Sequence, residues 1–119
     1  MLYSPPIDWM QCIELMSGND DLAKKLLILF MQHLPESQRN IQLAYQEMNL
    51  QRLSEQLHKL YGACCYCAVP NLTRVIDQMS SAVKAGLVEQ VKALYLLLDG
   101  EIQAVQQAYE RLSIEGILK

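Results

Sequence analysis

The chain has 119 residues, 51% of them hydrophobic and 19% charged, and its 10 Lys and Arg against 13 Asp and Glu give a net charge of −3. This composition excludes a disordered chain, and the length favours one domain over residues 1–119 that closes a single hydrophobic core. The sequence has no basic stripe, no signal peptide and no apolar run of about 20 residues, so we expect a cytoplasmic protein that contacts neither nucleic acid nor membrane.

The N-terminal segment is predicted to be a stiff lead-in followed by a short helix. Residues 1–6 end in "SPP", which favours an extended conformation and is typical of the remnant of a linker. The next ten residues, "IDWMQCIELM", have the apolar spacing of a helix, and Asp8 is suited to cap its first turn. The sequence "SGN" at 17–19 should end that helix.

A long second helix is predicted from Asn19 to about Met48. Asn19 and the two aspartates after it place acceptors and negative charge where the first amides of a helix lack partners. Pro35 lies inside this segment and removes one backbone donor. Because the apolar face resumes in phase beyond the proline, we expect a kink near Met31 rather than two helices.

Two further helices are predicted after that. Asn49 should cap a helix that reaches about Cys67, and Pro70 suits the first turn of the next one. Gly86 should end this fourth segment by accepting a left-handed conformation.

The last helix is predicted from Leu87 to near the C-terminus. Gly100 interrupts it at a cost of about 1 kcal/mol, less than the packing of so long an apolar stripe supplies. No segment alternates as a strand does. The predicted fold is therefore all-α: an antiparallel up-down four-helix bundle with a short extra N-terminal helix.

The four cysteines are predicted to be reduced core residues. Three of them crowd the window "CCYC" at 64–67, and no secretory signal precedes them. Cys64 and Cys67 have a spacing that zinc ligands use, but both fall on the apolar seam of the predicted helix, and a second pair is missing. We therefore expect no metal site.

The helix that contains His58 has one apolar seam and one polar face. The seam consists of Leu50, Leu53, Leu57, Leu60, Cys64 and Cys67. His58 projects about 135° away from the seam. It shares the polar face with Gln51, Ser54, Glu55 and Gly62. The imidazole should therefore be exposed to solvent.

The other histidine, His33, lies about 60° from the apolar centre of its own helix, which favours semi-buried packing over chemistry.

The stretch "HKLYGACCYCAVPNL" at 58–72 resembles the motif of histidine-containing phosphotransfer (HPt) domains, roughly H-x-L-K-G-A/S-A/S-x-x-x-G-x-x-x-L. The resemblance is to the HPt domain at the C-terminus of BarA/GacS-type tripartite hybrid sensor histidine kinases. Similar residues also occur in this family at the positions of Phe30, Pro35, Ile41 and Ala44. The likeness thus covers about two thirds of the chain.

The resemblance implies that His58 takes a phosphoryl group from the aspartate of one receiver domain and passes it to the aspartate of a response regulator. A neutral imidazole has a lone pair for in-line attack. Gly62, one turn further on, should leave room for the phosphoryl group and a docking receiver, and the flexible Lys59 is expected to stabilise the charge on the phosphoryl oxygens. The expected partner-binding residues are Gln51, Ser54, Glu55 and Tyr61.

The sequence departs from the family pattern at three positions. Tyr61 stands where the family often has Lys, and Ala68 where it usually has Gly. Many relatives also have a Gln 22 residues after the histidine, where this chain has Ser80, with Gln78 nearby. Either of these two could orient His58, and the sequence does not decide between them.

The implied protein is a phosphocarrier and not an enzyme in its own right, since the chain has no Gly-rich nucleotide loop. It would be free-standing or the C-terminal part of a hybrid kinase, at the cytosolic end of a membrane-anchored protein. It should be monomeric and need no cofactor, because Mg²⁺ would be held by the partner receiver domain. Two alternatives stay open: a non-phosphorylated adaptor that binds receiver domains, and a homodimeric structural bundle.

Overall fold

Three of the helices begin at a polar residue that caps their first turn. The computed structural model describes residues 4–117. The first three helices are α1 (Trp9–Leu15), α2 (Asp20–Gln46) and α3 (Leu50–Cys64). The side chains of Asp8, Asn19 and Asn49 each accept a hydrogen bond, of 3.0 to 3.1 Å, from the backbone N–H three residues on. The three predicted caps are therefore confirmed.

The last two helices also begin as the sequence predicts. They are α4 (Pro70–Lys84) and α5 (Val88–Ile114). Pro70 is the first helical residue of α4, where its missing N–H costs nothing. Gly86 follows the end of α4 with φ +69°, and α5 continues through Gly100 without a break.

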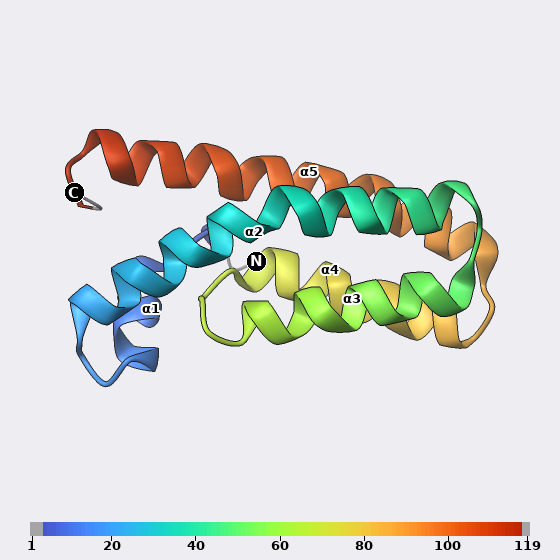
Figure 1. Cartoon of the computed structure of the whole chain (residues 1–119), viewed down its shortest axis with the longest axis horizontal. Coiled ribbons are helices and arrows are strands. Elements are labelled where there is room, and N and C mark those ends of the chain that lie inside the picture. The colour runs from blue at the N-terminus through green and yellow to red at the C-terminus, as the bar shows by residue number, and fades with distance from the viewer. Residues whose placement is uncertain (1–3, 118–119) are drawn as a thin grey trace.

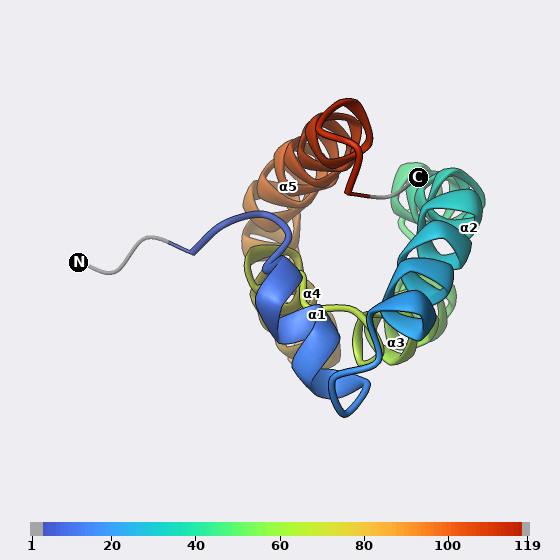
Figure 2. The same ribbon diagram turned by 90° about the vertical axis from the view of Figure 1, so that its left-hand side faces the viewer.

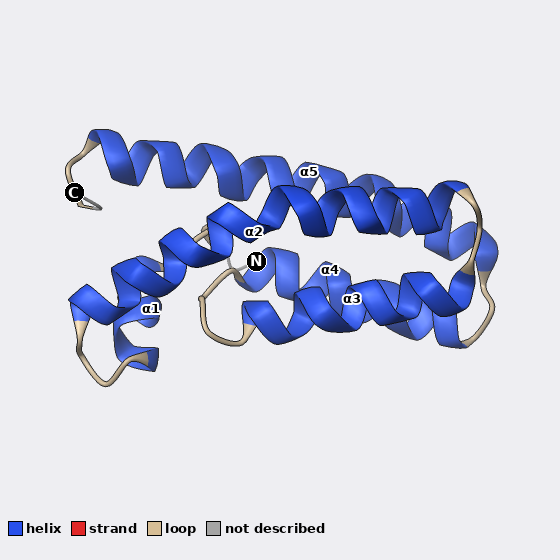
Figure 3. Cartoon of the chain, viewed as in Figure 1, coloured by secondary structure: helices blue, strands red, loops and turns tan. Residues whose placement is uncertain are grey.

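Helices α2 to α5 form an antiparallel up-down bundle, and α1 packs across one end. Figure 1 shows α2 and α3 running in opposite directions, as do α4 and α5. Figure 2 looks at the end of the bundle and shows α1 lying across it. Figure 3 shows helices and loops only, so the part of the chain that is described contains no strand. The predicted fold is confirmed.

The core lies between the four long helices, and α3 contributes to it along one stripe. Leu53, Leu57 and Leu60 are each at most 1% exposed, and Cys64 is buried one turn further on. Apolar residues of the other helices complete the core; among the largest are Leu27, Leu34, Ile41, Leu72, Ile76, Met79, Leu98 and Ile102. Because α3 buries only this stripe, its opposite face is left to solvent.

The seam between α2 and α5 is closed by large side chains. The rings of Tyr45 and Tyr95 stack with centroids 3.8 Å apart. The amide of Gln38 donates a hydrogen bond of 3.0 Å to the carboxylate of Asp99. Burial raises the pKa of the Tyr95 hydroxyl, with smaller contributions from Asp99 and Tyr45. These two contacts join α2 to α5 across this side of the bundle.

The predicted helix ends differ from the observed ones at two places. The helix of His58 was expected to reach Cys67 but ends at Cys64. The backbone bonds tighten to i→i−3 over residues 65–67, and the chain turns so that the Ala68 carbonyl accepts a hydrogen bond of 2.9 Å from the N–H of Asp8. The second helix ends at Gln46, two residues early, and Met48 adopts φ +50° in the turn that leads to Asn49. Both turns shorten the helices without moving their buried faces.

Pro35 leaves α2 continuous, as predicted, and Figure 1 shows the helix changing direction near its middle.

Residues 1–3 of the predicted lead-in lie outside the described residues. None of the helices between residues 4 and 117 is both long enough and apolar enough to span a membrane.

Candidate phosphotransfer site

His58 lies in the middle of α3, and its side chain is exposed. It projects away from the buried stripe of Leu53, Leu57 and Leu60, as the helical spacing predicts. Within residues 4–117, His58 takes part in neither a side-chain hydrogen bond nor an ion pair. Its ring nitrogens are thus available to a partner from outside the chain.

A shallow depression adjoins His58 on the side of α4, and we refer to it as the His58 groove. It is lined by Ser54, Glu55, His58, Ser80 and Lys84 and has a volume of about 300 Å³. Because α3 and α4 run antiparallel, Ser80 lies nearer the level of His58, and Lys84 lies nearer the level of Ser54. The groove thus combines two hydroxyls, one carboxylate and one ammonium group around the imidazole.

Gly62 lies one turn after His58 on the same face of α3. A Cβ atom added at Gly62 would meet no atom of this protein within 4 Å. Packing inside the domain therefore does not require glycine here, although a glycine within a helix costs about 1 kcal/mol relative to alanine. The open space beside His58 that the sequence predicts at this position is present.

The other predicted site residues of α3 are distributed over more than one surface. Ser54 and Glu55 line the His58 groove, while Gln51 and Lys59 are exposed on α3 outside the groove. Tyr61 is 38% exposed and borders a separate depression that α1 and α4 also line. The structure therefore brings together only part of the predicted docking surface.

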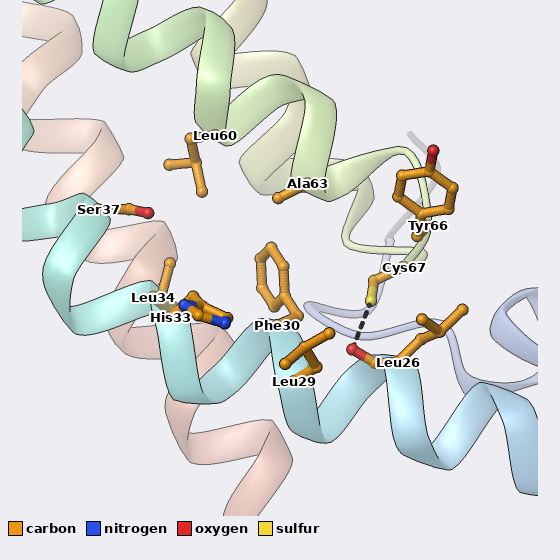
Figure 4. Close-up of a pocket in the computed structure, with 10 residues that line it drawn as sticks. All are labelled: Leu26, Leu29, Phe30, His33, Leu34, Ser37, Leu60, Ala63, Tyr66 and Cys67. Atoms are coloured by element: carbon orange, nitrogen blue, oxygen red, sulfur yellow. Dashed lines mark hydrogen bonds between the residues drawn. The ribbon is translucent and has the colours of Figure 1, made fainter.

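An apolar groove runs between α2 and α3 on the other side of the exposed face. It has a volume of about 170 Å³. It is lined by Leu26, Leu29, Phe30, His33, Leu34, Ser37, Leu60, Ala63, Tyr66 and Cys67 (Figure 4). Figure 4 shows Phe30 projecting from α2 towards α3 between these side chains. Ala63, the residue after Gly62, connects the apolar groove with the face that presents His58.

The prediction for His33 is wrong in one respect. It was expected to be semi-buried, but its side chain is exposed at the edge of the apolar groove. The position lies far enough from the centre of the apolar face of α2 for the ring to reach solvent while bordering the groove.

The cysteines are thiols, and three of the four are buried: Cys12, Cys64 and Cys67, with Cys65 exposed. Burial raises the pKa of both Cys64 and Cys67 to about 12. Cys67 donates a hydrogen bond of 3.7 Å to the carbonyl of Leu26 (Figure 4). Among residues 4–117, no group of three or more His, Cys, Asp or Glu side chains is arranged to hold a metal ion. Cys64 and Cys67 are therefore protonated core thiols at neutral pH. The prediction of four core cysteines is wrong for Cys65, which follows the last helical residue of α3 and lies at the surface.

Lys84 was not among the predicted site residues, which on α4 were limited to Gln78 and Ser80. One pattern in the sequence could have pointed to Lys84: it lies one turn after Ser80, on the same edge of the apolar face of α4. Of the two residues considered for orienting His58, Ser80 lines the His58 groove, whereas Gln78 borders a different depression between α4 and α5. Finding Lys84 required the register of α3 against α4.

Known proteins with similar sequences and structures are sensor kinases and their domains. A family model described as "Hpt domain" matches residues 25–108, which include His58 and Gly62. The signal transduction histidine-protein kinase BarA of Escherichia coli K12 is 26% identical over 84 residues, 71% of this chain and 9% of BarA. The sensor protein GacS of Pseudomonas syringae pv. syringae is 27% identical over 88 residues, 74% of this chain and 10% of GacS.

This chain therefore spans about a tenth of the length of these curated relatives. The crystal structure of the HPT domain of a hybrid histidine kinase from Shewanella superposes with a TM-score of 0.82 at 31% sequence identity, covering 91% of this chain and 94% of that one. The fold, the exposed histidine and the family model all indicate the same family. The chain belongs to the Hpt domain family, the histidine phosphotransfer modules of two-component phosphorelays.

Proposed function

We propose that this domain carries a phosphoryl group on His58 between the aspartates of two receiver domains, one in a hybrid sensor kinase and one in a response regulator. The observation that carries this proposal is an exposed imidazole that no side chain of residues 4–117 binds, one turn from a glycine where an added Cβ would meet no atom within 4 Å. A donor aspartate can thus approach His58 without displacing a side chain of this domain.

The reaction needs little from this chain except positioning. The lone pair of a neutral ring nitrogen attacks the phosphorus in line, and the N–P bond forms as the P–O bond to the aspartyl carboxylate breaks. The electrons of the broken bond stay with the carboxylate, and the other ring nitrogen keeps its proton. The reverse sequence delivers the group to the second receiver. Mg²⁺ would be held by the receiver domain, and this chain would act as a carrier without turnover of its own.

The receiver domain would dock on the exposed face of α3 and on the two grooves that flank it. The predicted contacts Gln51, Ser54 and Glu55 lie on or beside the His58 groove. On the other side, Leu29 is 48% exposed at the apolar groove, which continues from Gly62 through Ala63. An apolar surface of the receiver would gain free energy by covering this groove. Tyr61 would be a peripheral contact.

A receiver-binding adaptor that is never phosphorylated is the alternative that the departures at Tyr61, Ala68 and Ser80 favour. The test is incubation with a receiver domain labelled on its aspartate, for the protein as it is and for the variants H58Q and H33Q. We expect acid-labile, base-stable label on the unaltered protein and complete loss of label in H58Q. The variant H33Q should take up as much label per molecule as the unaltered protein.

Three results would contradict the proposal. Binding of receivers without any label would establish the adaptor. Label that survives in H58Q would place the phosphoryl group elsewhere. A mass that rises with concentration, together with the absence of receiver binding, would favour the homodimeric structural bundle.

A further inference from the structure

We infer that the His58 groove is a binding site for the phosphoryl group and that Lys84 of α4, rather than Lys59 of α3, supplies its cation. This inference rests on the proposed function. It assigns a role to a residue that lies 26 positions from the histidine in the sequence but lines the same groove.

The groove has the size and the donors that a phosphoryl group needs. Its volume of about 300 Å³ exceeds by several times the roughly 30 Å³ that one water molecule occupies in the liquid. The hydroxyls of Ser54 and Ser80 donate no hydrogen bond within the described chain, whereas those of Thr73 and Ser113 each donate to a carbonyl of their own helix. Two half-buried hydroxyls are therefore free to donate to phosphoryl oxygens.

A phosphoryl group on His58 and the carboxylate of Glu55 would repel each other in the groove, and a cation on α4 would offset this repulsion. A phosphoryl group carries about −1.5 to −2 charges at neutral pH, and Glu55 adds a carboxylate to the same groove. Lys84 offsets this repulsion, and in the described residues its ammonium forms no ion pair with a carboxylate, unlike Lys92, which lies 3.4 Å from Glu89. Lys84 lines the groove about one turn along α4 from the level of His58, and its flexible four-carbon stem lets the ammonium group move along the groove.

Lys59 is less well placed for the same task. It follows His58 directly, so its side chain leaves α3 about 100° around the helix axis. It is exposed and does not line the His58 groove. Tyr61, at the position where the family often has a lysine, borders the other depression. Of the two lysines, only Lys84 lines the groove that contains His58.

The experiment compares the rate of phosphoryl transfer from a labelled receiver domain for K84Q, K59Q and K92Q. We expect K84Q to slow transfer about ten-fold or more, K59Q to slow it less than three-fold, and K92Q, on the far helix, to match the unaltered protein. K84R should restore most of the rate, since the charge is kept. Equal rates for K84Q and the unaltered protein, or a larger loss in K59Q than in K84Q, would overturn the inference.

A second measurement separates contact with the phosphoryl group from contact with the receiver. The domain is charged by phosphoramidate in the absence of any receiver, and the phosphohistidine is titrated by ³¹P NMR. We expect K84Q to raise the pKa of the phosphoryl group, because a nearby ammonium favours the dianion. An unchanged pKa would overturn the role of Lys84. A protein that takes no label on His58 from any donor would instead refute the proposed function itself.

Discussion

Two faces of this bundle each expose a glycine inside a helix, Gly62 near the end of α3 and Gly100 near the middle of α5, and the two faces differ in the polar groups that they present. Gly62 of α3 and Gly100 of α5 both have no atom within 4 Å of an added Cβ. Both faces also expose large apolar side chains, Leu29 beside α3 and Leu96 on α5, the latter 74% exposed. Open space and surface leucines therefore do not by themselves identify function.

The difference lies in what the neighbouring helices bring to each glycine. On the face of Gly62, α3 also presents His58; Ser80 and Lys84 of α4 line the groove beside His58, and α2 forms the far wall of the apolar groove. Around Gly100, in contrast, the nearest tertiary feature is the α2–α5 seam, which Gln38 and Asp99 close by a hydrogen bond. The proposed docking site would thus be formed by three helices rather than by one motif.

The largest expected contrast comes from filling the space at each glycine with a long side chain. G62Q should reduce the rate of phosphoryl transfer by at least about a hundred-fold, because its side chain would occupy the position of the docking receiver. G100Q should leave the rate unchanged, since α5 lies across the bundle from α3. Transfer kinetics and circular dichroism of both variants provide the check. Equal rates for both would mean that Gly62 has no part in docking.

The apolar groove gives a second contrast, of intermediate size. L29E should weaken receiver binding about ten-fold, because a carboxylate at the apolar groove would have to be desolvated in the complex. L96E alters a still more exposed leucine on α5 and should bind as the unaltered protein does. Isothermal titration calorimetry with one receiver domain measures both affinities. If L96E weakened binding as much as L29E, docking would not be confined to the α3 face.

The smallest expected effect is on the free energy of unfolding, and it should be the same at both glycines. G62A and G100A should each raise the free energy of unfolding by about 0.5 to 1 kcal/mol, because alanine is the better helix former and neither Cβ meets an obstacle. Urea denaturation measures both changes. A loss of stability in G62A would show that packing within the domain, and not a partner, requires this glycine.

Much of the fold could be predicted because its signals are local. Asn19, Asn49 and Pro70 act within one turn of where they stand, and the apolar spacing of each helix fixes its buried face. The error at Cys67 arose because the turn after Cys64 is held by a contact between distant residues, the hydrogen bond from the N–H of Asp8 to the carbonyl of Ala68. On α4 the sequence left Gln78 and Ser80 open and did not point to Lys84, because which residues of α4 line the groove of His58 depends on the register of two helices, which no local pattern encodes.

The two histidines also show which features follow from local sequence and which depend on how the helices pack. His58 stands opposite a continuous apolar seam, so its direction followed from helical geometry alone. His33 stands beside the apolar face of α2, where exposure depends on how closely the neighbouring helix approaches. The sequence could not supply that distance.

The central claim, that this domain carries a phosphoryl group from one receiver to another, is tested most directly by a chase. The domain is charged by one labelled receiver, purified from it, and mixed with a second receiver domain and Mg²⁺. The account predicts that the label moves stoichiometrically from His58 to the aspartate of the second receiver, and that chelation of Mg²⁺ leaves it on this chain. Label that only hydrolyses to inorganic phosphate, at the same rate with and without the second receiver, would contradict the account.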